Sequence, residues 1–420
     1  MLEETATDEN LPNANVRTTL QSLLRRLWNC ERFELERGSA KGDNYLGVVW
    51  RVRIFETSTP RSLILKLPPQ NRVRRKQFFA RPCFLRETLA YEHFLPLTQE
   101  FQAKHGIPIE KRFNHHAQCY GSSDVENDEC IFLEDLCSNG YALHDRFAAL
   151  PTAHVELLMR VYGKLHAVSL AMKQQEPARL RLCQSMVDIF EQRKEDAALG
   201  AYCEALKLNA RQSLCAKQDA EYVRRLDAYF ARGTFFELLL PLVNAANCEP
   251  YAVVCHGDCW NNNIMYQTTP ELVVSNVRLI DWQLMRYASP VTDLAYFFFT
   301  CTTHEFRVQH FERMLDVYYE ELTLHLTRLG ANGSELFPRR EFEAQLHEKF
   351  AVGLLLAMMV LPIVTMRGDD VPDLQAISEH IEAGNTTNLE EVGFLGTGNE
   401  AEYNRRMRGV ILTCVDKDYI

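Results

Sequence analysis

The segment CHGDCWNNNIMY, residues 255–266, places a histidine, an aspartate and three consecutive asparagines directly before an apolar run. Asparagine and aspartate are depleted in strands and favour turns, so an Asx-rich hairpin turn is one interpretation of the segment. The spacing supports a second interpretation. Asp258 precedes Asn263 by five positions, and Asp281 follows in LIDW, where a predicted strand ends.

These three side chains match the needs of phosphoryl transfer. The reaction needs a carboxylate that orients the attacking hydroxyl and accepts its proton, and hard oxygen ligands that hold magnesium against nucleotide phosphates. Asp258, the amide oxygen of Asn263 and Asp281 supply these parts. An Asp-x4-Asn pair followed by a metal-binding aspartate is also the arrangement of the protein-kinase catalytic loop. The segment therefore predicts chemistry that uses ATP and Mg²⁺.

A glycine-bearing turn upstream, KGDNYLG, is a candidate phosphate contact. Gly42 and Gly47 lie at a turn between two predicted strands, where backbone N–H groups can approach a phosphate closely. Any hairpin can carry such glycines, so an ordinary turn remains the alternative.

Lys66 stands inside the apolar strand LILKLP, where a buried ammonium group is expensive without a partner. Glu87 on the following predicted helix can be that partner, which gives the lysine–glutamate pair that positions the α- and β-phosphates. Glu92 competes for this role, and Glu87 is preferred because it lies nearer the start of the helix. Alternatively, Lys66 extends along the strand to an edge and keeps its charge in water.

Two further segments complete the predicted site. IFLEDL (131–136) is expected to cross between two lobes, with the backbone around Glu134 and Leu136 available to hydrogen-bond an adenine edge. Asp293 precedes a strongly apolar helix in SPVTDLAYFF. It is expected to brace the catalytic loop, to act as the N-cap of that helix, or to do both.

The order of predicted elements indicates an α+β chain of two lobes. A helix from Val16, strands joined by hairpins within 38–55 and 61–68, a helix from Phe84 and two strands, the second ending at Leu136, describe a small antiparallel sheet with one helix. Beyond residue 139, helical patterns dominate, except for an island of strands and loops at 252–283. We expect a disordered terminus at 1–15, an N-lobe at 16–137 and a C-lobe at 138–420.

Composition limits the functions that are open to the chain. A net charge of −10 argues against a nucleic-acid binder. The apolar run 350–366 is 17 residues long and contains Pro362, so a buried helix is favoured over a membrane span. Thirteen irregularly spaced cysteines and an acidic, polar start without a signal sequence predict reduced thiols and a cytoplasmic location. No obligate protein partner is evident. A zinc site at Cys255, His256 and Cys259 is disfavoured, because no second ligand pair with suitable spacing accompanies it.

The motifs CHGDCWNNNIMY, IDWQLMRYASPVTDLAYF, KGDNYLG, LILKLP and FLEDL together resemble the ecdysteroid kinase-like family. That family is related to choline kinases and aminoglycoside phosphotransferases, and the resemblance runs from about residue 38 to residue 299. It implies a protein-kinase-like bilobal fold, with Asp258 as catalytic base and Asn263 and Asp281 as magnesium ligands. It also implies that Lys66, paired with Glu87, contacts the nucleotide phosphates.

The acceptor is expected to be a small alcohol rather than a protein. Gly257 occupies the position of the arginine in His-Arg-Asp, DWQ replaces Asp-Phe-Gly, and only twelve positions separate Asp281 from Asp293. This leaves little room for an activation loop. The sequence therefore predicts a kinase for an ecdysteroid, a steroid-like molecule or a xenobiotic alcohol. A choline- or aminoglycoside-type phosphotransferase and a nucleotide-binding pseudokinase that acts as a scaffold remain the alternatives.

Overall fold

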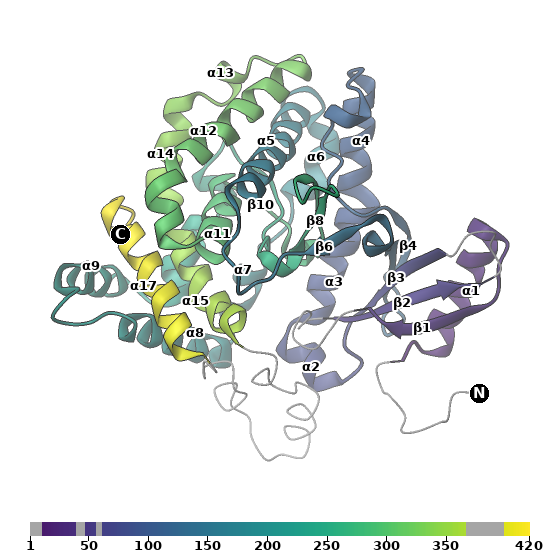
Figure 1. The fold of residues 1–420 in the computed structure, drawn as a ribbon, viewed down its shortest axis with the longest axis horizontal. Coiled ribbons are helices and arrows are strands. Elements are labelled where there is room, and N and C mark those ends of the chain that lie inside the picture. Colours follow the sequence, from purple (N-terminus) through teal and green to yellow (C-terminus); the bar gives the residue numbers. More distant parts are fainter. Residues whose placement is uncertain (1–10, 39–46, 56–60, 367–398) are drawn as a thin grey trace.

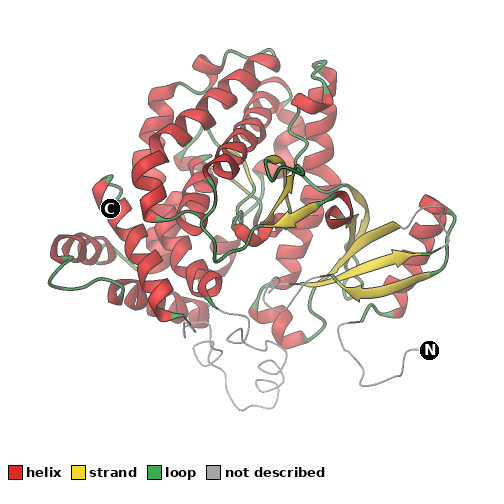
Figure 2. Cartoon of the chain, in the orientation of Figure 1, coloured by secondary structure: helices red, strands yellow, loops and turns green. Residues whose placement is uncertain are grey.

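An antiparallel sheet of five strands forms the N-terminal part of the computed structural model, which describes residues 11–38, 47–55, 61–366 and 399–420. The strand order is β1-β2-β3-β5-β4, and the larger remainder of the chain is mainly helical (Figures 1 and 2). The chain thus has the predicted α+β class with two lobes. The strands of this sheet are β1 (Phe33–Arg37), β2 (Val48–Ile54), β3 (Arg61–Leu67), β4 (Cys119–Ser123) and β5 (Cys130–Glu134).

One face of the sheet is covered by helix α1 (Ala14–Trp28), which lies beside β1 and β2 (Figure 1). Val16, Leu20 and Leu24 recur at helical spacing and pack against the buried strand residues Trp50 and Leu65. The helix begins two residues earlier than predicted, because the Asn13 side chain accepts a hydrogen bond from the N–H of Val16 and caps the first turn. Helix α1 thus includes residues 14–15 of the segment that was expected to be disordered, and residues 1–10 lie outside the described ranges.

The other face of the sheet meets a long helix with an irregular middle. It consists of α3 (Ala80–Leu89), a π-helical turn η1 (Ala90–Phe94) and α4 (Leu95–Lys104), preceded by the short helix α2 (Arg72–Gln77). The helix thus starts four residues before the predicted Phe84. Strand β5 ends at Glu134 rather than at Leu136, because the Asp135 side chain accepts from the N–H of Cys137 and begins a 3₁₀ turn. Strand β1 was not predicted.

The C-terminal part combines helices with two small sheets. Strands β6 (Tyr141–Leu143), β8 (Ile264–Thr268) and β9 (Val274–Leu279) form one sheet, and β7 (Val253–Cys255) pairs with β10 (Arg286–Ala288) in the other. The described helices are α5 (Thr152–Gln175), α6 (Pro177–Gln184), α7 (Ile189–Arg193), α8 (Ala197–Gln212), α9 (Ala220–Phe230), α10 (Phe235–Val243), α11 (Val291–Cys301), α12 (His304–Arg328), α13 (Gly333–Leu336), α14 (Arg339–Lys349), α15 (Ala351–Thr365) and α17 (Glu400–Asp416).

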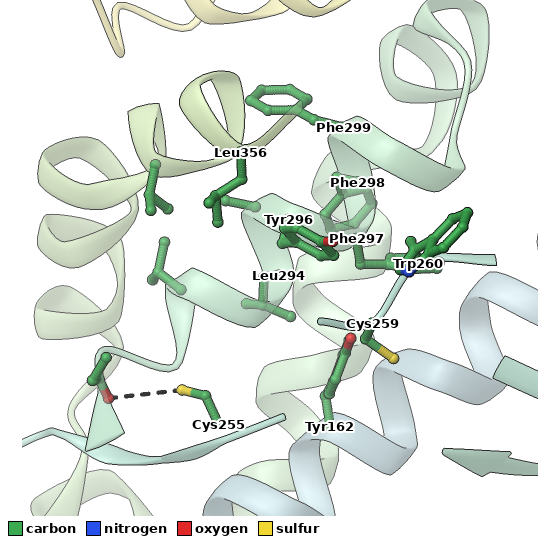
Figure 3. Packing of buried hydrophobic residues seen from close by; sticks show 14 of the residues in the cluster. Tyr162, Cys255, Cys259, Trp260, Leu294, Tyr296, Phe297, Phe298, Phe299 and Leu356 are labelled. Atoms are coloured by element: carbon green, nitrogen blue, oxygen red, sulfur yellow. Dashed lines mark hydrogen bonds between the residues drawn. The ribbon is translucent and has the colours of Figure 1, made fainter. Parts of the chain in front are cut away.

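Helices α11 and α15 form the centre of the C-terminal core. Phe297, Phe298 and Phe299 of α11 are fully buried, and Leu356 of α15 lies in the same cluster (Figure 3). The two helices approach so closely that a Cβ atom on Gly353 would lie 2.5 Å from the carbonyl oxygen of Ala295. The apolar run 350–366 is therefore a core helix, as predicted.

Across the described ranges, no single helix is long and apolar enough to cross a membrane. One bent pair, Gly333–Lys349 with Ala351–Thr365, meets the length and composition limits jointly, with an angle of 49° between its two parts. The lobe boundary near residue 137 stays a prediction.

Candidate active site

A buried ion cluster joins the two parts of the chain. The ammonium group of Lys66 lies 2.6 Å from a carboxylate oxygen of Glu87 and 2.6 Å from one of Asp281. Glu87 is 1% exposed and Lys66 is 6% exposed. Burial alone would lower the pKa of Lys66, but the charges of Asp281 and Glu87 outweigh it and raise that pKa, so the lysine is a cation. Lys66 therefore does not extend to an exposed edge of the strand.

Local structure explains how these three side chains meet. Lys66 lies on central strand β3, opposite Val49 of β2 and Ile131 of β5, and α3 brings Glu87 over the sheet. Glu92, the competing partner, is in the π-helical turn, where its carboxylate accepts from the Ser122 hydroxyl at 2.9 Å.

Asp281 follows β9 in a left-handed backbone conformation, with φ of 66°. This uncommon conformation for a non-glycine residue turns the chain directly after the strand. The N–H of Ile280 donates to the carbonyl oxygen of Asn263 at 3.0 Å, which ties the segment before Asp281 to the loop that carries Asn263.

The loop that carries Asp258 is held by Asp293. The N–H groups of His256 and Gly257 donate to the two carboxylate oxygens of Asp293 at 2.7 and 2.8 Å. His166 of α5 lies 3.2 Å from the same carboxylate. Burial works against ionisation here, but the hydrogen bond from His166 and the backbone N–H groups hold the pKa of Asp293 below its usual range. Asp293 thus braces the loop. It lies in the first turn of α11 rather than at its N-cap, which is Pro290.

His256 acts on the backbone around this loop. The N–H of Asp258 donates to Nδ1 of His256 at 3.3 Å, so Nε2 carries the ring proton and donates to the carbonyl oxygen of Ile280 at 3.0 Å. Burial also lowers the pKa of His256, which favours this neutral form. His256 therefore connects the loop of Asp258 with the segment before Asp281.

Asp258 is buried and accepts from several donors. Its Oδ1 accepts from the Tyr296 hydroxyl at 2.5 Å, and its Oδ2 lies 3.2 Å from Nδ2 of Asn263 and 3.4 Å from Nε2 of Gln283. Burial and the nearby charge of Asp281 raise the pKa of Asp258 to about 7, although the hydrogen bonds from Tyr296 and Gln283 oppose this rise. A carboxylate with this pKa can exchange a proton near neutral pH.

A cavity of about 360 Å³ opens beside the ion cluster. Lys66, Glu87, Asn263 and Asp281 are among the residues that line it. Most of its other lining side chains are apolar, and they are Val49, Ile64, Ala117, Leu133, Leu136, Ala142, Leu143, Met265 and Ile280.

Three of the four other residues that the sequence predicts to contact the nucleotide are described in the structure, namely Glu134, Leu136 and Gly47. Glu134 and Leu136 both line the cavity. The N–H of Glu134 donates to the carbonyl oxygen of Gln118, and its carboxylate accepts from the Gln118 N–H and the Asn139 side chain. Gly47 is buried directly before β2, whereas Gly42 lies outside the described residues.

The disfavoured zinc site gains no support from the geometry. Among the described residues, the group with metal-ligand spacing that includes Cys255 joins it to His166 and Asp293, not to His256 and Cys259. The Cys255 thiol contacts the carbonyl oxygen of Ser289 at 3.4 Å, and burial raises its pKa well above the usual value. Cys255 is thus a protonated packing residue.

The sequence interpretation missed two residues that contact Asp258. Gln283 lies two positions after Asp281, and Tyr296 lies three positions after Asp293 on the same face of α11. The spacing of Asp293 and Tyr296 was visible in the sequence. Its significance depended on knowing that this face of the helix meets the Asp258 loop.

The two-lobed fold, the shared lysine and the Asp-x4-Asn loop beside an apolar cavity define the class of kinase-like phosphotransferases. The model of the ecdysteroid kinase-like family matches residues 41–331. The chain therefore belongs to the ecdysteroid kinase-like family, a family of kinase-like phosphotransferases that act on small molecules.

Solved structures that match the chain include three small-molecule kinases. Plasmodium vivax ethanolamine kinase is 14% identical, with 99% of this chain and 93% of that chain covered and a TM-score of 0.42. The GDP complex of a mutant aminoglycoside 2′-phosphotransferase is 11% identical, with 78% and 96% covered and a TM-score of 0.41. The AMP complex of a spectinomycin phosphotransferase is 13% identical, with 90% and 98% covered and a TM-score of 0.37. No curated protein matches the chain in sequence.

Proposed function

We propose that this protein is an ATP- and magnesium-dependent kinase that phosphorylates a hydroxyl group of an ecdysteroid, a steroid-like molecule or a xenobiotic alcohol. One observation carries the kinase proposal. Lys66 is buried between Glu87 and Asp281 at 2.6 Å from each, at the wall of an apolar cavity that Asn263 also lines. Membership of the ecdysteroid kinase-like family supports the steroid-like acceptor class.

In this proposal the cavity binds ATP. The adenine ring lies between apolar side chains such as Val49 and Met265, and the hinge backbone near Glu134 and Leu136 recognises its edge. Lys66 contacts the α- and β-phosphates, and Glu87 holds the lysine in place. The sequence also predicts phosphate contacts at Gly42 and Gly47, of which Gly47 lies directly before β2.

The donor set beside this cavity suits magnesium. Asn263 donates through Nδ2 to the main-chain oxygen of Asp258 at 2.7 Å, which leaves its amide oxygen as the atom available to a cation. Asp281 adds a carboxylate, and hard oxygen ligands of this kind are those that Mg²⁺ prefers. When bound, the ion neutralises charge on the phosphates. Asn263 and Asp281 would hold it.

Asp258 is the proposed catalytic base. The acceptor hydroxyl transfers its proton to the Asp258 carboxylate while its oxygen forms a bond to the γ-phosphorus. The bond between that phosphorus and the β,γ-bridging oxygen breaks, and ADP leaves with the electron pair. The reaction needs no reductant or oxidant. We place it in the cytosol, where the thirteen cysteines stay reduced.

Nucleotide binding can be measured through Cys137. This residue is exposed and lines the cavity, whereas Cys215 is exposed elsewhere. We expect MgATP to slow maleimide labelling of Cys137 at least several-fold and to leave Cys215 unchanged, as followed by peptide mass spectrometry. Equal labelling rates at Cys137 with and without MgATP would place the nucleotide somewhere other than this cavity.

The acceptor class requires a screen of alcohols. Transfer of labelled γ-phosphate is measured with hydroxylated sterols and ecdysteroids, with choline and ethanolamine, and with aminoglycosides. Preferential phosphorylation of the sterol group supports the proposal, and preference for an amino alcohol supports the choline-type alternative. Protection of Cys137 by MgATP without transfer to any acceptor would indicate a nucleotide-binding pseudokinase.

We expect turnover to depend on pH through Asp258. Only the ionised carboxylate can accept the proton, so kcat/KM should rise with pH through about 7 and fall below it. The charge of Asp281 contributes to the raised pKa of Asp258, so a cation bound at Asp281 should lower that pKa. The rise of kcat with pH should therefore occur at a lower pH than the rise of kcat/KM. A flat profile of kcat/KM between pH 5 and pH 9 would contradict the assignment of Asp258 as base.

A further inference from the structure

Helix α11 contacts the catalytic loop at two points. Asp293 accepts from the backbone N–H groups of His256 and Gly257, and Tyr296, three residues later on the same face, reaches Asp258. Tyr296 is 3% exposed and belongs to the buried cluster of the C-terminal core (Figure 3). The helix therefore positions both the backbone of the loop and the side chain of the proposed base.

The two carboxylate oxygens of Asp258 have unequal partners. Oδ1 accepts a short hydrogen bond of 2.5 Å from the Tyr296 hydroxyl. Oδ2 has only longer contacts, 3.2 Å from Nδ2 of Asn263 and 3.4 Å from Nε2 of Gln283. The Asn263 amide group also donates to the main-chain oxygen of Asp258 at 2.7 Å, so its contact with Oδ2 is the weaker of the two.

We infer that Tyr296 is a positioning residue that occupies Oδ1 of Asp258, so that Oδ2 is the oxygen that receives the proton of the acceptor hydroxyl. This inference rests on the proposed function and deepens it. An O–H donor at 2.5 Å fixes the rotation of the carboxylate about its last bond. Oδ2 keeps lone pairs for the incoming proton, because its N–H contacts are long.

The phenol is suited to this role. Burial, together with the charge of Asp258, raises the pKa of Tyr296 well above its usual value, so the hydroxyl stays protonated and donates. Neighbouring Phe297, Phe298 and Phe299 show that aromatic rings without a hydroxyl pack in the same helix. The hydroxyl of Tyr296 is thus needed for its contact with Asp258 rather than for filling space.

The test is a double-mutant cycle on the full-length protein. Tyr296→Phe removes only the hydroxyl, and it is made alone and in combination with Asp258→Asn. For each variant, transfer of labelled phosphate to the best alcohol of the screen is followed under single-turnover conditions. We expect Tyr296→Phe to lower kcat about 10- to 100-fold, with KM for ATP changed less than about twofold. In the Asp258→Asn background, Tyr296→Phe should lower kcat by less than about twofold. A residue that acts only by positioning the base has no further effect once the base has been removed.

Tyr403→Phe is the matched control. Tyr403 of α17 is also buried, at 2% exposed, and burial raises the pKa of its hydroxyl, as it does for Tyr296. The variant should keep the wild-type kcat. Equal losses from Tyr296→Phe in both backgrounds, or no loss in either, would overturn the inference.

The outcomes separate this inference from the proposed function. Wild-type turnover in Asp258→Asn refutes the proposed base, and the inference falls with it. A large loss in Asp258→Asn with no effect of Tyr296→Phe refutes the inference alone. If no alcohol accepts phosphate, both are refuted.

Discussion

Replacing Asp258 with asparagine is expected to lower phosphoryl transfer about 10²- to 10⁴-fold, the range over which a positioned base contributes. The amide is close in shape to the carboxylate and can still accept the Tyr296 hydroxyl at 2.5 Å. It cannot take up a proton near neutral pH. Because Asp258 does not line the cavity proposed to bind the nucleotide, MgATP should still protect Cys137 in this variant.

The measurement compares single-turnover transfer with nucleotide affinity in the same preparation. Asp124→Asn, a change of the same kind at an exposed position after β4, is the control and should behave as the wild type. If the Asp258 variant turns over at the wild-type rate, another group accepts the proton. If nucleotide affinity falls together with transfer, Asp258 contributes to binding rather than to the chemical step.

Replacing Gly257 with alanine is expected to lower the free energy of unfolding of the protein strongly. Gly257 has φ of +85°, a region that side chains with a Cβ rarely adopt. An added Cβ would lie 2.0 Å from the carbonyl oxygen of Leu284 and 2.8 Å from its carbonyl carbon. These are backbone atoms, so no side-chain rotation can relieve the clash, and we expect a loss of about 3–5 kcal/mol from overpacking and backbone strain together.

Gly106→Ala separates the two causes of this loss. Gly106 has φ of +69°, but a Cβ added there would meet no described heavy atom within 4 Å beyond its own chain neighbours, so alanine adds backbone strain alone. Thermal unfolding should show a much larger drop in Tm for Gly257→Ala than for Gly106→Ala. Similar drops in the two variants would mean that the segment of Leu284 moves away without cost.

Several parts of the site were predictable because their chemical signal is local. The offset of five between Asp258 and Asn263 lies within one loop, and the amide of Asn263 does reach Asp258. Lys66 stood out as a charge inside an apolar strand, where burial without a partner is expensive. Glu87 was selected over Glu92 from its position on the helix, and Lys66 does pair with Glu87.

Other parts were not predictable because no local pattern marks them. The sharing of Lys66 between Glu87 and Asp281 brings together residues from a strand, a helix and a loop of the other lobe. The early start of α3, the π-helical turn after it and the end of β5 at Glu134 depend on capping and packing contacts rather than on periodicity.

By itself, the sequence predicted the class of chemistry, because Asp258, Asn263 and Asp281, the proposed base and metal ligands, lie at characteristic spacings within one stretch of the chain, residues 258–281. Only the tertiary structure decided how the base is held. Tyr296 is thirty-eight positions from Asp258 and meets it because α11 packs against the loop. Asp293 accepts hydrogen bonds from the backbone of the loop, and Tyr296 donates a hydrogen bond to one carboxylate oxygen of Asp258. The direction of a single hydroxyl is set by the packing of a whole helix, and spacing along the chain does not contain that information.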